Sequence, residues 1–138
     1  MKLLLIQNDI YEHVEDNIKH LQDMFKDIDE KDVDVICFAE MFTTPYQLDY
    51  FKKNKQDMHG PVMAFLKQIA LKFQAIVIGG SIPENDQGKI FNTSFVINAK
   101  GEIIHKYRKI HLFSLTYPNG QHFNEADVLS AGKNLCIV

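Results

Sequence analysis

The spacing of hydrophobic residues changes twice along the first half of the chain. Residues 3–6 form a continuous apolar run, whereas residues 14–28 carry apolar side chains three and four positions apart. The first pattern is typical of a strand covered on both faces, and the second of a helix with one buried side. Apolar runs at 33–39 and 75–78 predict two further strands. A helix that begins at Gly60-Pro61 and ends near Phe73 is expected between them.

The second half of the chain has shorter segments and more turn residues. Residues 84–88 (Glu-Asn-Asp-Gln-Gly) predict a turn, and residues 91–98 and 102–107 predict two strands joined by a tight turn at 98–101. After Lys109 we expect a loop as far as Gly120. The remaining expectations are a solvated polar stretch at 52–56 and the start of an apolar strand at 135–138.

Strands joined by helices imply parallel pairing with right-handed crossovers, and the later hairpin adds antiparallel strands. The sequence therefore predicts one α/β domain over residues 1–138, with a mixed sheet and helices on one face. Two long helices can cover only that face, so a second layer is expected from residues after 138. Without it, the chain would expose apolar surface, and it would either form homo-oligomers that cover this surface or be marginally stable and bind a hydrophobic dye.

Composition narrows the class of protein. Hydrophobic residues make up 46% of the 138 positions and charged residues 24%, as in a folded globular domain. The formal net charge is −3, so the chain lacks the excess of positive charge that proteins use to bind nucleic acid or an anionic membrane. No apolar run approaches the roughly 18 residues of a membrane span, and no secretory cleavage site follows the first apolar stretch. We expect a cytoplasmic protein that binds neither nucleic acid nor membrane.

Glu40 is the first candidate for chemistry, because it directly follows the strand expected at 33–39. Open α/β sheets place their ligand crevices at such strand ends. Flanking apolar residues would desolvate this carboxylate partly and raise its pKa toward the range of a general base. An acid that caps a loop or pairs with a lysine explains the position equally well.

Lys109 is the second candidate, within residues 107–113 (Tyr-Arg-Lys-Ile-His-Leu-Phe). Strand alternation places Tyr107 and Lys109 on one face and Arg108, the single arginine of the chain, on the other. A lysine inside a pocket can stabilise an oxyanion as a fixed positive charge. A solvated basic strand end is the simpler interpretation of the same pattern.

The two cysteines do not indicate a nucleophile, a disulfide framework or a metal site. Cys37 lies within an expected buried strand, where desolvation raises the thiol pKa, and Cys136 lies in an apolar segment. Nucleotide binding is also disfavoured. A Rossmann-like fold needs a glycine fingerprint after Ile6, where Gln-Asn-Asp stands instead.

Taken together, the motifs resemble the nitrilase superfamily of carbon–nitrogen hydrolases over essentially the whole chain. Seven segments carry the resemblance in order: 38–42 (Phe-Ala-Glu-Met-Phe), 78–84 (Ile-Gly-Gly-Ser-Ile-Pro-Glu), 92–94 (Asn-Thr-Ser), 100–102 (Lys-Gly-Glu), 107–113, 123–125 (Phe-Asn-Glu) and 131–132 (Ala-Gly). Residues 44–46 (Thr-Pro-Tyr) and 79–84 look most like the omega-amidase branch. The resemblance implies a four-layer αββα sandwich, of which this chain would be the incomplete N-terminal part.

The resemblance also implies roles for named residues. Glu40 would be the general base, Lys109 the oxyanion stabiliser and Glu125 a supporting carboxylate, and Phe42 and Tyr46 would contact substrate. The family's nucleophile is a cysteine in a Cys-Tyr-Asp/Glu context, which is absent here, so it would lie beyond residue 138. No metal and no cofactor are implied.

The expected function is hydrolysis of small-molecule amides, specifically short dicarboxylate mono-amides such as 2-oxoglutaramate. The 138 residues alone would then be inactive. The alternative is a truncated, inactive homologue that acts as an interaction module.

Overall fold

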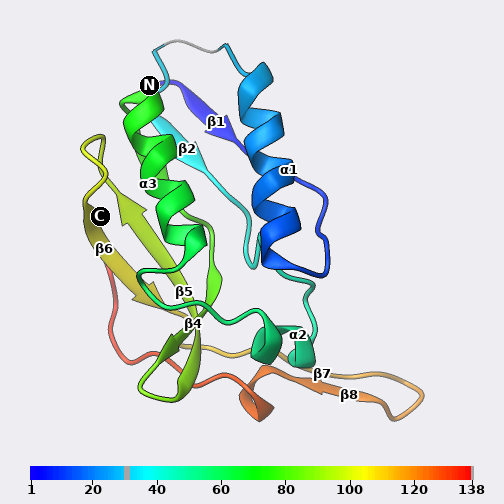
Figure 1. The fold of residues 1–138 in the computed structure, drawn as a ribbon. Helices are drawn as coiled ribbons and strands as arrows, with labels where there is room; N and C mark the ends of the chain where they lie inside the picture. The colour runs from blue at the N-terminus through cyan, green and yellow to red at the C-terminus, as the bar shows by residue number, and fades with distance from the viewer. Residues whose placement is uncertain (30–31, 138) are drawn as a thin grey trace.

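The computed structural model describes residues 1–29 and 32–137. Its helices and strands follow one another as an α/β chain (Figure 1). In chain order they are β1 (Leu3–Leu5), α1 (Val14–Asp27), β2 (Val35–Cys37), α2 (Leu48–Lys53), α3 (Pro61–Phe73), β3 (Ile76–Ile78), β4 (Ile82–Asp86), β5 (Lys89–Ile97), β6 (Ile103–Arg108), β7 (Ser114–Thr116), β8 (His122–Asn124) and the 3₁₀ turn η1 (Glu125–Asp127).

The main sheet has six strands and is mixed, as the sequence predicts. Strands β1, β2 and β3 pair in parallel, and β3 then pairs antiparallel with β5. The long strand β5 also pairs antiparallel with β4 and β6. Hairpin connections thus add β4, β5 and β6 to a parallel core, so β5 links the two halves of the sheet.

Helices α1 and α3 lie side by side on one face of this sheet (Figure 1). Ile36 of β2 and Val77 of β3 point toward them and are fully buried. From the helices, Leu21, Phe25 and Leu66 pack into the same core. The apolar residues of α1 and α3, spaced three and four positions apart, therefore give each helix one apolar side, and this side is buried against the sheet as the sequence predicts.

The opposite face of the parallel strands is open. On this face lie Leu3 and Leu5, on either side of the half-buried Leu4, and Ile76 and Ile78, on either side of the buried Val77. Their exposed fractions are 51%, 72%, 38% and 38%. These apolar strands are thus covered on one face only. We call Leu3, Leu5, Ile76 and Ile78 the open sheet face.

Three local expectations are wrong in part. Within residues 52–56 the three lysines are exposed as expected, but Asn54 is buried and helix α2 ends at Lys53. Strand β4 extends through Asp86, so the predicted turn shortens to Gln87 and Gly88, which both have positive φ. The expected loop between Lys109 and Gly120 contains strand β7, which forms a hairpin with β8 just beyond it, so that Leu115 pairs with Phe123.

The apolar strand expected at 135–138 is not formed by its described residues. Leu135 and Ile137 are 87% and 89% exposed and pair with no strand among the residues that the structure describes. An apolar run becomes a strand only when a neighbouring strand accepts its backbone hydrogen bonds. Val138 lies outside the described residues.

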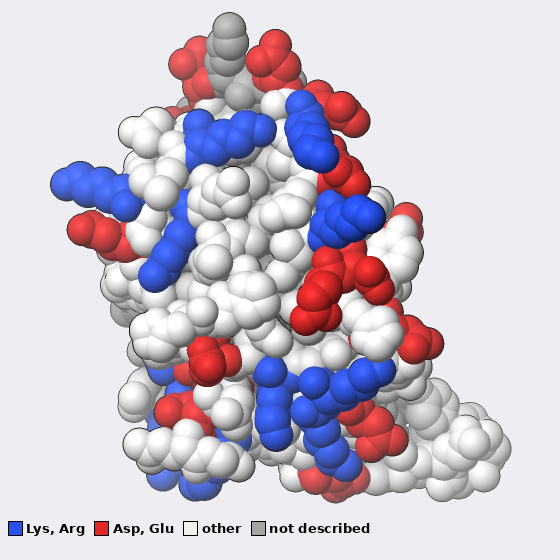
Figure 2. Space-filling view, in the orientation of Figure 1, with Lys and Arg blue, Asp and Glu red and all other residues white. Residues whose placement is uncertain are grey.

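Charges on the helix-covered side are mixed. Figure 2 shows lysine and acidic side chains next to one another, with no extended region of a single sign in this view. Among the described residues, no helix has the length and apolar character needed to cross a membrane.

The buried carboxylate of Glu84 connects strands β4, β5 and β6 through hydrogen bonds. Glu84 of β4 is 1% exposed and accepts hydrogen bonds from Arg108 Nε (2.7 Å), Lys106 Nζ (2.9 Å) and Thr93 Oγ1 (2.7 Å). Arg108 also donates to Asp86 over 2.6 Å. These donors come from β5 and β6, so one carboxylate connects three strands.

We predict that Glu84→Gln lowers the free energy of unfolding by about 3 kcal/mol, because removing one partner leaves buried charge uncompensated. Urea unfolding monitored by circular dichroism measures the change. Asp23→Asn, which removes the exposed partner of Lys26, is the control and should leave the midpoint unchanged. Equal midpoints for Glu84→Gln and the parent chain would contradict the role of this carboxylate.

The same ion pairs predict acid sensitivity. Burial raises the pKa of Glu84, but hydrogen bonds from Arg108, Lys106 and Thr93 outweigh it and bring the pKa below its usual value. A depressed pKa means that the stabilisation is complete above the pKa of the unfolded chain and is lost as the pH falls through the folded value. Glu84→Gln should therefore show a weaker loss of stability between neutral and acidic pH than the parent.

The open sheet face predicts self-association of the 138-residue chain, because contiguous exposed apolar surface drives association. Sedimentation should show dimers or larger species, and a hydrophobic dye should bind. Leu5→Lys with Ile78→Lys should shift the chain toward monomer and reduce dye binding. Leu71→Lys, on exposed α3 surface, is the matched control. A stable parent monomer that binds no dye would contradict the prediction.

Candidate active site

Glu40 lies in a sharp turn that follows β2. Met41, the next residue, has a positive φ of 51°, and its N–H donates to Ser81 Oγ over 3.0 Å. Gly80 approaches Ala39 so closely that an added Cβ would lie 2.0 Å from the Ala39 carbonyl oxygen. Only glycine fits this contact, which holds the turn carrying Glu40 against the junction between β3 and β4.

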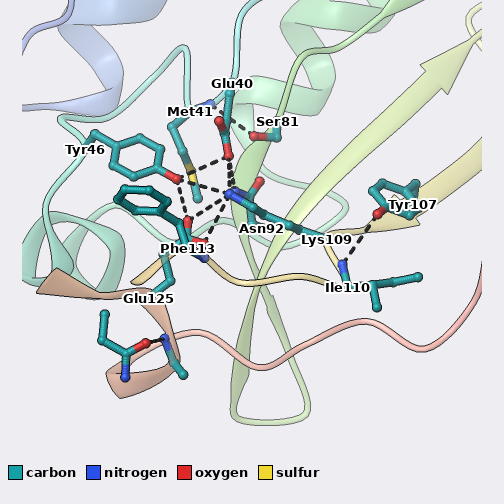
Figure 3. A network of polar contacts seen from close by, with 12 residues as sticks. Glu40, Met41, Tyr46, Ser81, Asn92, Tyr107, Lys109, Ile110, Phe113 and Glu125 are labelled. Carbon is teal, nitrogen blue, oxygen red and sulfur yellow. Dashed lines mark hydrogen bonds and ion pairs between the residues drawn. The ribbon is translucent and has the colours of Figure 1, made fainter. Parts of the chain in front are cut away.

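Lys109 follows β6 and extends its ammonium group to two carboxylates (Figure 3). Its Nζ lies 3.0 Å from Glu40 Oε1 and 3.1 Å from Glu125 Oε2. The Tyr46 hydroxyl accepts a hydrogen bond from the same nitrogen over 3.3 Å. The structure thus brings together Glu40, Lys109 and Glu125, the three residues that the motifs single out for one site.

Glu125 is the fully buried member of the group. Its Oε2 accepts the backbone N–H of Phe113 over 2.6 Å, and its Oε1 accepts the Tyr46 hydroxyl over 2.5 Å. Its own N–H donates to the Phe113 carbonyl oxygen over 2.9 Å. One side chain therefore closes the base of the β7–β8 hairpin and holds Lys109 and Tyr46 in place.

Asn92 of β5 completes the network; it lies in the segment 92–94 that carries the family resemblance, but the motifs assign it no role. Its Nδ2 donates to Glu40 Oε1 over 2.7 Å, and its backbone carbonyl accepts the N–H of Lys109 over 2.8 Å. Asn92 is almost fully buried within β5. The available signal was a polar residue inside a predicted strand, where burial requires a hydrogen-bond partner.

A cavity of about 340 Å³ lies beside these groups. Its lining residues come from the ends of β2 and β3 and from β5 and β6: Phe38, Glu40, Ile78, Gly80, Ser81, Asn92, Ser94, Tyr107 and Lys109. Tyr107 and Lys109 share this cavity, whereas Arg108 points away to Glu84, as strand alternation predicts. A small molecule in the cavity would meet a carboxylate and an ammonium group on one side.

Comparison with known proteins shows the family to which the chain belongs. The family model described as "Carbon-nitrogen hydrolase" matches residues 3–138. The chain belongs to the carbon–nitrogen hydrolase family. This confirms the family inferred from the motifs.

Carbon–nitrogen hydrolases with similar sequences include three curated relatives. Nitrilase homolog 2 of Dictyostelium discoideum is 36% identical over 137 residues, which are 98% of this chain and 40% of that protein. Omega-amidase NIT2-A of Xenopus laevis is 33% identical, covering 99% and 49%. Omega-amidase NIT3 of Saccharomyces cerevisiae is 38% identical, covering 76% and 38%. The chain thus spans half or less of the length of these relatives.

Solved structures of this family share the fold. The crystal structure of Saccharomyces cerevisiae Nit3, a member of branch 10 of the nitrilase superfamily, aligns with a TM-score of 0.77 at 29% identity. The alignment covers 97% of this chain and 49% of that structure. XC1258 of Xanthomonas campestris aligns with a TM-score of 0.79 at 22% identity, a likeness of fold alone. The nitrilase-like α/β fold is therefore confirmed.

The pKa of Glu40 moves in the direction opposite to the expectation. Burial raises it, but the hydrogen bonds from Lys109 and Asn92 outweigh burial and lower the pKa below its usual value. Burial lowers the pKa of Lys109, yet hydrogen bonds to Glu40 and Glu125 raise it well above its usual value. Both groups are therefore charged at neutral pH in this carbon–nitrogen hydrolase.

Phe42 and Tyr46, the two residues expected to contact substrate, differ in burial. Phe42 is fully buried and packs against Phe38 with ring centroids 4.8 Å apart, so its side chain has no surface to offer a substrate. The expectation for Phe42 is wrong, because the turn after β2 directs the ring into the core. Tyr46 is partly exposed, with its ring against Phe51 and its hydroxyl inside the polar network.

Neither thiol joins the network of Glu40 and Lys109. Cys37 is half-buried in β2, in register with Leu5 and Ile78, and burial raises its pKa. Cys136 lines an adjoining cavity, which shares Ile78, Ser94 and Tyr107 with the cavity beside Glu40. Within residues 1–29 and 32–137, no group of acidic, histidine and cysteine side chains is placed to hold a metal ion.

The contacts of Glu125 predict how the hairpin responds to substitution. Glu125→Gln keeps the size of the side chain but weakens a charge-assisted hydrogen bond to the Phe113 N–H. We expect the Phe113 amide to exchange with solvent roughly tenfold faster, since such a bond contributes about 1.5 kcal/mol or more. Hydrogen-exchange NMR measures this rate. Glu102→Gln, at a distant turn, is the control, and unchanged protection in Glu125→Gln would refute the anchoring role.

Proposed function

We propose that this chain supplies the general base and the oxyanion-stabilising lysine of an amidase, an enzyme that hydrolyses carbon–nitrogen bonds in small amides. The observation that carries the proposal is the Lys109 ammonium group, held between Glu40 and Glu125 at the edge of a cavity. Membership of the carbon–nitrogen hydrolase family supports the same reaction class.

In this proposal, Glu40 is the base. An amide carbonyl is a poor electrophile, so attack by a cysteine thiolate through a thioester divides one difficult step into two. Glu40 accepts the proton of the thiol as the sulfur–carbon bond forms, which gives a tetrahedral intermediate. Glu40 passes this proton to the departing ammonia as the carbon–nitrogen bond breaks. It then takes a proton from the water that attacks the thioester and returns it to the cysteine sulfur as the sulfur–carbon bond breaks. Its low pKa keeps it ionised and ready to accept the first proton.

Lys109 stabilises the charge that develops on the substrate oxygen. The tetrahedral intermediates of both steps carry an oxyanion, and a fixed ammonium group beside it lowers the barrier. The two carboxylates raise the pKa of Lys109, so this positive charge is present throughout the neutral pH range. Glu125 supports the site by holding Lys109 and Tyr46, and the exposed part of the Tyr46 ring contacts the substrate.

The nucleophile in this proposal is a cysteine from a Cys-Tyr-Asp/Glu segment outside the 138 residues. Cys37 and Cys136 are both in other environments, so the 138 residues alone are inactive. The substrates are short dicarboxylate mono-amides such as 2-oxoglutaramate. Support for this class comes from relatives named omega-amidases, which are 33% and 38% identical to the chain. The proposed enzyme uses no metal or cofactor and forms a homo-oligomer.

The open sheet face favours a second candidate function. Four apolar side chains of β1 and β3 are exposed on it, which is the kind of surface that binds another protein. A catalytically inactive homologue would use this face as an interaction module. The full gene separates the two functions: a product with a Cys-Tyr-Asp/Glu segment favours the enzyme, and a product without one favours the module.

We predict that the full gene product releases ammonia from 2-oxoglutaramate, and that Glu40→Gln reduces kcat by about 10³-fold or more, because the site loses its base. A coupled ammonia assay measures the rates. Glu102→Gln, which removes a carboxylate at the turn after β5, is the control and should keep the parent rate.

Aliphatic nitriles and N-carbamoyl compounds complete the assay panel. Preference for either would overturn the proposed substrate class while leaving the family unchanged. Full turnover by Glu40→Gln would overturn the base assignment, and no hydrolysis of any compound in the panel would overturn the amidase proposal.

A further inference from the structure

We infer that Asn92 is a positioning residue for Glu40, and that its hydrogen bond gives the two carboxylate oxygens of Glu40 different roles. Oε1 is the anchored oxygen, and Oε2 is the atom that accepts the proton. The inference rests on the proposed function, since it specifies how the base of that reaction is held.

The hydrogen bonds of Glu40 all reach the same oxygen atom (Figure 3). Oε1 accepts Asn92 Nδ2 over 2.7 Å and Lys109 Nζ over 3.0 Å, and the Tyr46 hydroxyl lies 3.2 Å from it. None of the hydrogen bonds made by residues 1–29 and 32–137 reaches Oε2. Glu40 is half-exposed and lines the cavity, so its unbonded oxygen is the one available to a reacting group.

Asn92 differs from the other two donors in its chemistry. The Tyr46 hydroxyl has a single proton, and Glu125 lies closer to it than Glu40 does. Lys109 divides its three protons among Glu40, Glu125 and Tyr46. The amide of Asn92 is not ionisable and donates at every pH, so it can hold Glu40 without exchanging a proton with it.

The backbone makes Asn92 a rigid support. Asn92 is 3% exposed within β5 and is paired with Pro83 of β4. Its carbonyl accepts the N–H of Lys109, so the same residue sets the positions of both Glu40 and Lys109. A base held on one oxygen by a strand keeps the other oxygen at a fixed distance from the thiol proton that it must remove.

The charged and titratable groups around Glu40 predict what a change at residue 92 does. Lys109, Tyr46 and, through them, Glu125 face Glu40 from three segments, and Tyr107 lines the same cavity. The two carboxylates share one ammonium group. A third carboxylate at residue 92 would lie at hydrogen-bond distance from Oε1, where two like charges favour a shared proton.

The test compares Asn92→Asp, Asn92→Ala and the control Asn119→Asp in the full gene product. Asn119→Asp adds the same charge at the tip of the β7–β8 hairpin, where the side-chain oxygen that accepts the Gln121 N–H is retained. Carbon-13 NMR of labelled glutamate carboxyl groups follows Glu40, with Glu40→Gln assigning its signal. The pKa of Glu40 should rise by about one pH unit or more in Asn92→Asp, rise less in Asn92→Ala, and stay constant in the control.

Steady-state kinetics supply the readout of positioning. Asn92→Ala should lower kcat about 10²-fold with KM within about threefold of the parent, because the base is misplaced while substrate binding is kept. In Asn92→Asp the acid limb of the kcat/KM profile should move to higher pH. An unchanged pKa of Glu40 in Asn92→Asp would overturn the inference, as would an unchanged kcat in Asn92→Ala.

The failure of the proposed function is distinguishable from that of the inference. A gene product that hydrolyses no amide overturns the amidase, and the NMR titration then decides alone whether Asn92 holds Glu40. Normal amidase activity with kcat unchanged by both substitutions at residue 92 overturns the inference and leaves the amidase intact.

Discussion

The candidate site depends on one ammonium group held between two carboxylates. Without Lys109, the charges of Glu40 and Glu125 would repel each other, and the fully buried Glu125 would lack its cationic partner. Lys109 offsets both charges, and each carboxylate in turn raises the pKa of the lysine. The result is a fixed positive charge and an ionised base beside one cavity, which is the pair of groups that amide hydrolysis through a thioester requires.

The sheet supplies the rigidity that this ion pair needs. Strand β5 contributes Asn92, whose side chain donates to Glu40 and whose carbonyl accepts the Lys109 N–H. On the other side of the same strands, Glu84 holds Arg108, the neighbour of Lys109 in sequence. Arg108, the last residue of β6, and Lys109, which follows it, thus bind carboxylates on opposite sides of the sheet. The backbone on both sides of the Arg108–Lys109 peptide is therefore fixed, so the fold sets the position of Lys109 more than its flexible side chain does.

Local sequence patterns predict the helices and motifs of this fold, because these depend on residues that are close in the sequence. The spacing of apolar residues identifies α1 and α3, and the motifs single out Glu40, Lys109 and Glu125, which the structure brings into contact. The pKa direction of Glu40 does not follow from local sequence, because the hydrogen bonds that outweigh burial come chiefly from Lys109 and Asn92, which lie far along the chain. Burial of Phe42 and the β7–β8 hairpin likewise depend on contacts that no local pattern records.

The most direct test of the account observes the Lys109 ammonium group itself in the full gene product. Nitrogen-15 NMR of lysine side chains, with Lys109→Met assigning the signal, reports hydrogen-bonded ammonium groups that exchange slowly with water. The account predicts a resolved Lys109 signal with through-hydrogen-bond couplings to the carboxyl carbons of both Glu40 and Glu125. A Lys109 signal averaged with those of the solvated lysines would contradict it.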